Sequence, residues 1–446
     1  MDIKKRPKKF LYTLLLISFT ATAQNKNINN FTVQQAVEYA KKNNTQVKNA
    51  LLNVKIQEQT NRGITAAAYP NITSSVGTTY FMDIPTSLIP AEAFGGTKGD
   101  YIPVRFGTKY NTTASVQLQQ LLFDGQVFVG LQARKASIDW KQHETEITEE
   151  AIKVNVYKIY YQLVVAKSQV ELLDANIARL DKLYHDVNEM YKNGFVEKLD
   201  VDKLDVNLIN LKTEKEKVNN SIAVGYIALK TLIGMSVKDS LILTDNISDS
   251  EIKSFALIDS VNYTDRKDYQ YWQSIKSLSE YQVKRYKLSY LPTVSANASY
   301  QKQALRNKYT FFEKGDWFST SYVGLNIAVP IFTGFSRDAK VKQSKLELQQ
   351  VNNNIDNLRN NIDAETEQAK LKFTNAVVTI DNQKRNMLLA EKVYEQTKKK
   401  FEAGTGSNTE INTAQTELKT AQTNYISALY DAIIAKVDYL KAIGKL

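Results

Sequence analysis

The stretch 322–334, YVGLNIAVPIFTG, decides the fold. Apolar side chains at Val323, Leu325 and Ile327 alternate with small or polar ones, which is the two-residue period of a β-strand with one apolar face. Pro330 cannot donate a backbone hydrogen bond within a sheet or a helix, and no proline follows it in the chain. The sequence therefore predicts a strand that ends near 331 and leads directly into a long helix.

Three other segments carry the same alternation. The runs at 114–118 and 294–300 are clear, and the run at 69–81 is the weakest. The predicted strands have about 10 to 13 residues, the length of a tilted strand that crosses a bilayer. One face is apolar and the other is small and polar, as expected for a wall between lipid and water. The aromatic residues at or near the strand ends match the girdles of outer-membrane barrels: Tyr69, Tyr80, Phe81, Tyr110, Phe123, Tyr290, Tyr300, Tyr322, Phe332 and Phe335.

A long helical hairpin is predicted after each strand pair. Apolar or small residues step by four and three over about 125–192 and, with one change of phase, over about 335–403. At 1.5 Å per residue, each of these helices is roughly 100 Å long. A second seam runs back from the glycine tips Gly194 and Gly404. The returning seams are Val201, Leu204, Leu208, Leu211, Val218, Ile222 and Leu229, and Ile411, Ala414, Leu418, Ala421, Ala428, Ala432 and Tyr439. Shorter helices are expected at about 32–67 and 255–289.

The chain also contains two similar halves. LFDG at 122–125 recurs as IFTG at 331–334, YKNG at 191–194 recurs as FEAG at 401–404, and LIG at 232–234 recurs as AIG at 442–444. Ordered recurrence at nearly one spacing indicates an internal repeat rather than chance similarity.

The predicted domains follow from this repeat. We expect a first structural repeat over 24–233, with a helix, a strand pair at about 69–123 and a hairpin at about 125–233. An inter-repeat segment then covers 234–254. The second repeat covers 255–446, with a strand pair at about 291–332 and a hairpin at about 335–442.

Residues 1–23 have the three parts of a signal peptide. A basic segment with Lys4, Lys5 and Arg6 precedes an apolar run, Phe10 to Phe19, that is too short for a spanning helix. Small residues at 21–23 then suit a cleavage site. A membrane anchor is the alternative interpretation. Much of the net charge of +11 lies in this segment, which weakens any case for a nucleic-acid partner.

The composition argues against an enzyme. Cys is absent from the 446 residues, which excludes disulfides, thiol nucleophiles and cysteine-based zinc sites. The two histidines, His143 and His185, lie roughly 60 Å apart on one predicted helix and are interpreted as solvated surface residues. Glutamates such as Glu144 and Glu150 are interpreted as helix surface, and no phosphate-binding glycine loop occurs. We therefore expect no catalytic residue, no cofactor and no metal.

Four strands leave two open edges. Unpaired backbone groups cannot lie in lipid, and eight strands are the usual lower limit for a closed barrel. The chain is therefore expected to oligomerise and to pool its strands with those of other copies around one axis.

The order of these features resembles the TolC-like outer-membrane efflux proteins. The resemblance rests on FTVQQAV at 31–37, on the two strand pairs, on the LFDG and IFTG turns and on the two glycine tips, and it spans essentially the whole mature chain. It implies a mixed α and β fold, in which a homotrimer shares one outer-membrane β-barrel that a periplasmic α-barrel tunnel of helical hairpins continues. Segment 234–254 would lie outside the tunnel near its middle.

The resemblance also implies a function and a gate. The chain would be a passive outer-membrane exit duct of a Gram-negative bacterium, to which a periplasmic membrane-fusion adaptor and an inner-membrane pump (RND, ABC or MFS type) dock. Asp200 and Glu410 match the family's acidic tip residues. Gly406, Thr413 and Phe401 stand where relatives have other gate residues, which puts the closing network in doubt. Both acids also open a returning helix, where they stabilise its N-terminus, and this alternative stays open.

Two other functions would also suit an exported, helix-rich chain. A periplasmic coiled-coil adaptor or a structural envelope protein without a pore would lack strands of membrane length. An exported enzyme would need a cluster of titratable residues, and the sequence offers none.

Overall fold

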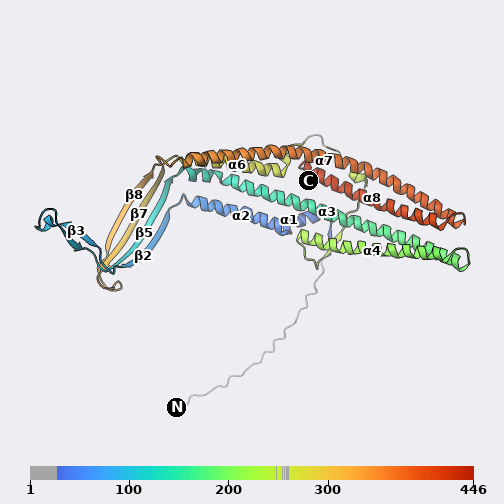
Figure 1. Ribbon diagram of the computed structural model, residues 1–446, viewed down its shortest axis with the longest axis horizontal. Helices are drawn as coiled ribbons and strands as arrows, with labels where there is room; N and C mark the ends of the chain where they lie inside the picture. The colour runs from blue at the N-terminus through green and yellow to red at the C-terminus, as the bar shows by residue number, and fades with distance from the viewer. Residues whose placement is uncertain (1–27, 248, 254, 256, 258–260) are drawn as a thin grey trace, which may run out of the picture.

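The computed structural model describes residues 28–247, 249–253, 255, 257 and 261–446. The expected signal peptide, 1–23, lies outside the described residues. The molecule is elongated, with a β-sheet at one end and two helical hairpins whose tips lie at the other end (Figure 1). Among the described residues, no helix combines the length and the apolar character needed to cross a membrane.

Four of the described strands form one antiparallel sheet in the order β2–β5–β7–β8. They are β2 (Asn71–Tyr80), β5 (Tyr110–Phe123), β7 (Thr293–Arg306) and β8 (Phe318–Ala328). This confirms the predicted strand pairs, although β8 ends at Ala328 rather than near 331. Strands of the two halves meet in the centre, and β2 and β8 each pair on one side only.

Each half continues into one long helix and one returning helix. The long helices are α3 (Gly125–Lys192, 68 residues) and α7 (Ser336–Glu402, 67 residues), and the returning helices are α4 (Lys198–Ile233) and α8 (Asn408–Ala442). The predicted seams are buried, most completely in α8, where Ile411 and Leu418 are fully enclosed. Asp124 caps α3 by accepting from the backbone N–H groups of Gln126 and Val127 at 2.7 and 3.3 Å, which explains why the helix begins there.

The short helices differ from the prediction. The first region is split into α1 (Val33–Asn43) and α2 (Thr45–Ala66), because Asn44 is extended and its side chain caps α2. The second helix, α6 (Lys267–Leu288), begins twelve residues later than the predicted 255. Two short helical turns precede α6: α5 (Asp249–Lys253) and η2 (Tyr263–Asp265).

Two small elements were not predicted. Strand β1 (Ile28–Phe31) pairs in parallel with β6 (Ser240–Leu243) beside the middle of the long helices. Between β2 and β5, β3 (Thr86–Pro90), η1 (Ala91–Phe94) and β4 (Tyr101–Arg105) form a hairpin that projects beyond the sheet (Figure 1). Both strand pairs are four or five residues long, too short for alternation to reveal them.

Candidate functional site

The sheet has two chemically different faces. Strand register places alternate residues of all four strands on a common face, because directly paired residues point the same way. The first, which we call the apolar face, contains Ile72, Val76, Val116, Leu118, Val294, Ala298, Val323, Leu325 and Ile327. The second, the polar face, contains Asn71, Thr73, Ser75, Asn111, Thr113, Ser115, Gln117, Gln119, Ser295, Asn297, Ser299, Gln301, Gln303, Thr320 and Asn326.

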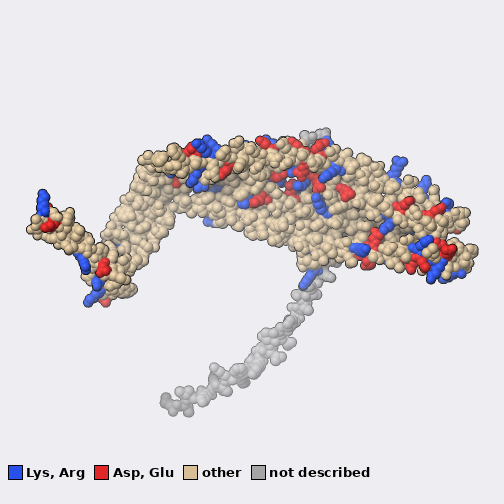
Figure 2. Space-filling view, viewed as in Figure 1, with Lys and Arg blue, Asp and Glu red and all other residues tan. Residues whose placement is uncertain are grey.

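The polar face is hydroxyl- and amide-rich and uncharged. No Asp, Glu, Lys or Arg lies on it in the four described strands. Its side chains bond across strands: the Ser75 and Ser115 hydroxyls are 2.9 Å apart, and Gln303 donates to Asn111 Oδ1 at 2.7 Å. The view in Figure 2 shows charged residues over the helices and the far loops, with the strand region between them tan. Such a face suits contact with water without selecting for charge.

The apolar side chains of the edge strand β8 are exposed in the single chain. Val323, Leu325 and Ile327 are 85%, 62% and 57% exposed. An apolar face of this extent is typical of a surface that meets lipid or another protein chain.

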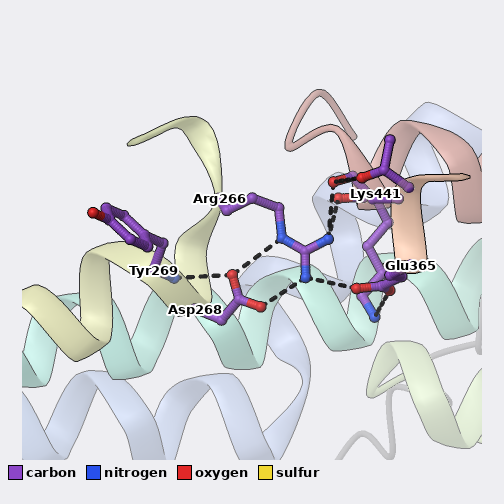
Figure 3. Close-up of polar contacts among 7 residues, drawn as sticks. Arg266, Asp268, Tyr269, Glu365 and Lys441 are labelled. Atoms are coloured by element: carbon purple, nitrogen blue, oxygen red, sulfur yellow. Dashed lines mark hydrogen bonds and ion pairs between the residues drawn. The ribbon is translucent and has the colours of Figure 1, made fainter. Parts of the chain in front are cut away.

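Arg266 links α6, α7 and the end of α8 beside the middle of α7 (Figure 3). Its guanidinium is buried, donates to Asp268 Oδ2 at 2.7 Å and to Glu365 Oε2 at 2.9 Å, and reaches the carbonyl oxygens of Lys441 and Ala442 at the end of α8. Burial works to lower the pKa of Arg266, but the two carboxylates outweigh it and raise the pKa above its usual range. The arginine therefore stays charged and donates to two carbonyls of the last turn of α8.

In the first half, Asn44 makes the equivalent contact with the end of the returning helix α4. Its Nδ2 donates to the Leu232 carbonyl at 2.6 Å, near the end of α4, while its Oδ1 caps α2. Gly234 follows in the left-handed region (φ 76°), as Gly444 does after α8 (φ 70°). A Cβ at Gly234 would overlap the backbone of Asn43, and a Cβ at Gly444 would overlap the backbone of Asp265.

The hairpin tips are two glycine turns. Gly194 (φ 80°) and Gly404 (φ 72°) adopt the left-handed conformation that ends α3 and α7, and their N–H groups bond to the carbonyls of Tyr191 and Phe401, each at 2.9 Å. The tips contact each other, since Asn408 Nδ2 donates to the Asp200 carbonyl at 3.3 Å.

The structure places both predicted gate acids in the first turn of a returning helix. Asp200 Oδ1 lies 3.8 Å from Lys203 Nζ, and Glu410 Oε2 lies 3.5 Å from Lys400 Nζ. Each carboxylate therefore faces a cation of its own chain, which weakens the negative potential that it presents. Ser407, rather than Glu410, caps α8 through its hydroxyl, 3.2 Å from the Glu410 N–H.

The departures from the family pattern have local reasons. Gly406 lies against the turn, and a Cβ there would come within 2.9 Å of the Phe401 backbone nitrogen, so this turn has no room for an arginine. The Phe401 ring is buried between the hairpins instead of reaching out, and Thr413 donates to the Thr409 carbonyl at 2.9 Å.

A groove between α4 and α8 near the tips escaped the sequence analysis. Its walls include Leu199 and Val206, each 57% exposed, and Asn412, Thr413 and Thr416 across from them. The period of α4 located its buried seam but did not show that a second apolar stripe faces outward.

The two histidines lie far from these features. His185 is exposed, as predicted. The prediction for His143 was wrong in part: it is half-buried, and its Nδ1 lies 2.7 Å from Ser274 Oγ, because α6 packs against α3 there. In the described part of the chain, no group of three or more His, Asp or Glu is placed to hold a metal ion.

Comparisons with known proteins agree with this architecture. A family model described as "Outer membrane efflux protein" matches residues 276–445. The chain is 18% identical to outer membrane protein TolC of Vibrio cholerae over 342 residues, which cover 75% of this chain and 77% of the relative. It is 21% identical to the proteases secretion protein PrtF of Dickeya chrysanthemi over 68% of this chain and 66% of the relative.

The solved structures extend the likeness to nearly the whole fold. A crystal structure of CusC aligns with a TM-score of 0.76 over 92% of this chain and 91% of that one, at 16% identity. The alignment covers both halves of a chain that the family model matches only in its second half. With its four-stranded sheet, its paired hairpins and these sequence relatives, the chain is similar in fold and in sequence to the TolC-like outer-membrane efflux proteins.

Proposed function

We propose that this protein is an outer-membrane channel-tunnel: a passive exit duct of a tripartite efflux or type I secretion system in a Gram-negative bacterium. The observation that carries the proposal is the two-faced sheet joined directly to hairpins roughly 100 Å long. The apolar face meets lipid, the uncharged polar face lines the pore, and the hairpins continue the pore through the periplasm. A family of transport ducts performs no chemistry, so the protein is no enzyme.

We infer that the functional unit is a homotrimer. The edges β2 and β8 leave backbone groups unpaired in each copy, and pairing β8 of one copy with β2 of the next closes a barrel without open edges. Light scattering of the detergent-extracted protein, corrected for bound detergent, should report three chains. A monomer would overturn this architecture.

The partners are proposed by the same reasoning. A periplasmic membrane-fusion adaptor and an inner-membrane pump of the RND, ABC or MFS type would supply cargo and energy to a duct that has neither. The groove between α4 and α8 supports an adaptor contact near the tips, because its exposed Leu199 and Val206 offer apolar anchors next to polar rims.

The test of function combines location and conductance. The protein should fractionate with the outer membrane, shift its gel mobility on heating, and form ion channels in planar bilayers. Leu325→Asp puts a charge in lipid at a cost of about 1 to 4 kcal/mol, depending on depth, and should reduce assembly. Asn326→Asp, on the polar face of the same strand, is the matched control and should assemble.

The alternative is a periplasmic adaptor or structural envelope protein without a pore. It predicts a protein that is released without detergent, no channels, and equal behaviour of the Leu325 and Asn326 variants.

We further propose that Asp200 and Glu410 form the periplasmic gate, with Gly194 and Gly404 as its hairpin tips. Around a three-fold axis, their copies would make acidic rings that favour cations. Asp200→Asn with Glu410→Gln should weaken cation selectivity and block by trivalent metal complexes. Asp181→Asn with Glu395→Gln, both exposed and set back from the tips, is the control. Unchanged selectivity and block in the first pair would leave only the helix-stabilising role.

The domain division also remains a proposal. We infer a signal peptide at 1–23, structural repeats at 24–233 and 255–446, and an inter-repeat segment at 234–254. The paired junctions at Asn44 and Arg266 support the repeat, since each ties a short helix to the end of the returning helix of its own half. N-terminal sequencing of the exported protein should find Gln24 first.

A further inference from the structure

Lys302 is a cation on the apolar face. Strand register places it in one row with Val76, Ala114 and Ser319, and its side chain is exposed. Its strand, β7, lies between β5 and β8 of the same chain, so the neighbours of Lys302 on the sheet are not supplied by another copy. A lysine in such a position needs a reason, because a charge facing lipid is costly unless it is paired.

The chain itself offers no anion to this lysine. Neither Asp nor Glu occurs on the apolar face of the four described strands, and the Lys302 side chain makes no ion pair or hydrogen bond with any described residue. The other charge on this face is Arg306, which is engaged elsewhere: it donates to the Thr310 carbonyl and lies 5.3 Å from the Phe311 ring. The missing partner of Lys302 is therefore an anion from outside the protein.

The position of Lys302 in the sheet identifies the leaflet. It lies near the end of β7 away from the long helices, four residues before the row of Tyr80, Tyr110 and Arg306. Four residues of a strand span about 13 Å, less along the membrane normal because barrel strands tilt. A lysine stem is long enough to carry its ammonium most of that way toward the headgroups. The Lys302 ammonium therefore lies toward the headgroups of the outer leaflet of the outer membrane and not toward the periplasmic leaflet.

The surroundings suit a lipid with a sugar headgroup. Beyond Lys302, an aromatic cluster of Tyr110, Tyr309 and Phe311 marks the interface, and Tyr309 and Phe312 are 58% and 94% exposed. Flat exposed rings at this level can pack against sugar faces. On the other side of Lys302 lies a strip in which Val116 and Val323 are exposed, with Ser74 and Ser321 in the same row as Val116; the apolar side chains of this strip match acyl chains.

We propose that Lys302 binds the phosphate of a phosphorylated glycolipid of the outer leaflet. The proposal rests on the proposed function only for the orientation of the sheet in the membrane. The ammonium pairs with the phosphate, the exposed aromatic rings contact the sugar, and the apolar strip packs against the acyl chains. One such site per chain would anchor the barrel at a fixed depth.

The test is lipid binding by the purified, detergent-solubilised full-length oligomer. Lipid A, lipid A with its phosphates removed and phosphatidylglycerol are titrated separately, and bound lipid per chain is measured by mass spectrometry after gel filtration. Wild type should bind phosphorylated lipid A at least about fivefold more tightly than the dephosphorylated form. This is the preference expected from one ion pair that stays partly exposed to solvent. Lys302→Gln should lose this preference, and Lys302→Arg should keep it.

Lys98→Gln is the matched control, because Lys98 is an exposed lysine of the loop between η1 and β4, outside the sheet. An equal loss of preference in Lys98→Gln, or full preference in Lys302→Gln, would overturn the proposal. Phosphatidylglycerol binding as tight as that of lipid A would contradict the glycolipid class. Conductance is measured on the same samples: all these variants should conduct as wild type, so a protein without channels would fail the proposed function and not this site.

Discussion

In each half of the chain, a short helix is joined to the end of the returning helix at a junction, formed by Asn44 in the first half and by Arg266 in the second. The two junctions make equivalent contacts with different chemistry. In the first half, the neutral amide of Asn44 donates to the Leu232 carbonyl, and Gly234 follows. In the second half, the charged guanidinium of Arg266 donates to the Ala442 carbonyl, and Gly444 follows.

The shared parts are set by the backbone. A helix end leaves carbonyls without intrahelical partners. The segment that packs against this end, 43–44 in the first half and 265–266 in the second, leaves no space for a side chain after the last turn. The variable part is the donor. Asn44 bonds to backbone alone, whereas Arg266 also gathers Asp268 and Glu365 from α6 and α7. The second junction thus links three helices through charge, and the first links its helices through packing and amide bonds.

The glycines should show the largest effect. Gly234→Ala places a Cβ 2.4 Å from the Asn43 carbonyl oxygen in a left-handed backbone, and we expect a loss of about 3 kcal/mol. Gly444→Ala, where the nearest backbone atom is 2.8 Å away, should lose less. Urea unfolding in detergent measures both.

The control for this pair is Gly63→Ala in α2, where a Cβ meets nothing within 4 Å. Alanine is the better helix former there, so this variant should gain up to about 1 kcal/mol. Equal losses at Gly234 and Gly63 would mean that crowding at the junction is not the cause.

Replacement of Arg266 should be the next largest effect. Arg266→Gln keeps some hydrogen bonding but leaves Asp268 and Glu365 without a cation, and we expect a loss of about 2 to 3 kcal/mol. The carboxylates are partly exposed, which keeps the loss below that of a fully buried pair. A double-mutant cycle with Glu365→Gln should give a clear coupling energy; no coupling would reduce Arg266 to its carbonyl contacts.

Asn44→Ala should cost less, about 1 to 2 kcal/mol, the range for a lost helix cap. Asn44→Asp keeps an acceptor for the cap of α2 but sets a buried carboxylate oxygen against the Leu232 carbonyl oxygen, so it should lose at least as much stability as alanine. The loss in Asn44→Ala should not depend on salt, because no charge changes, whereas that of Arg266→Gln should shrink at high ionic strength. If the stability loss in Asn44→Ala changed with salt, the contrast between an uncharged and a charged junction would be wrong.

Periodicity made most of this architecture predictable. The strands and long helices follow from apolar residues repeated many times, such as Ile411 and Leu418 in α8, so single exceptions did not matter. The junctions were not predicted, because Asn44 and Arg266 act through contacts 188 and 176 residues away. Asp200 and Glu410 were located by likeness to a family, but their own lysine partners, Lys203 and Lys400, were visible only in three dimensions.

The smallest expected effect concerns pH at the charged junction. Glu150, which was expected on the helix surface, is half-buried, and burial raises its pKa above the ordinary value against the pull of Arg266 and Lys441. The folded protein therefore holds this proton more tightly than the unfolded chain. That contribution to stability is complete below the unfolded pKa, near about 4.3, and is lost as pH rises through the higher folded pKa.

Glu150→Gln removes this titration, so the stability of wild type relative to the variant should fall as the pH rises from about 4 through the raised folded pKa. Arg266→Gln should steepen the fall, because Glu150 then loses the cation that lowers its pKa most, and its pKa rises further. Asn44→Ala, at the junction built from an uncharged amide, should leave the slope as it is in wild type. Urea midpoints of the four proteins across this range measure the slopes. Parallel curves for wild type and Glu150→Gln would show that the carboxyl is solvated, and that the two junctions differ in donor but not in their response to pH.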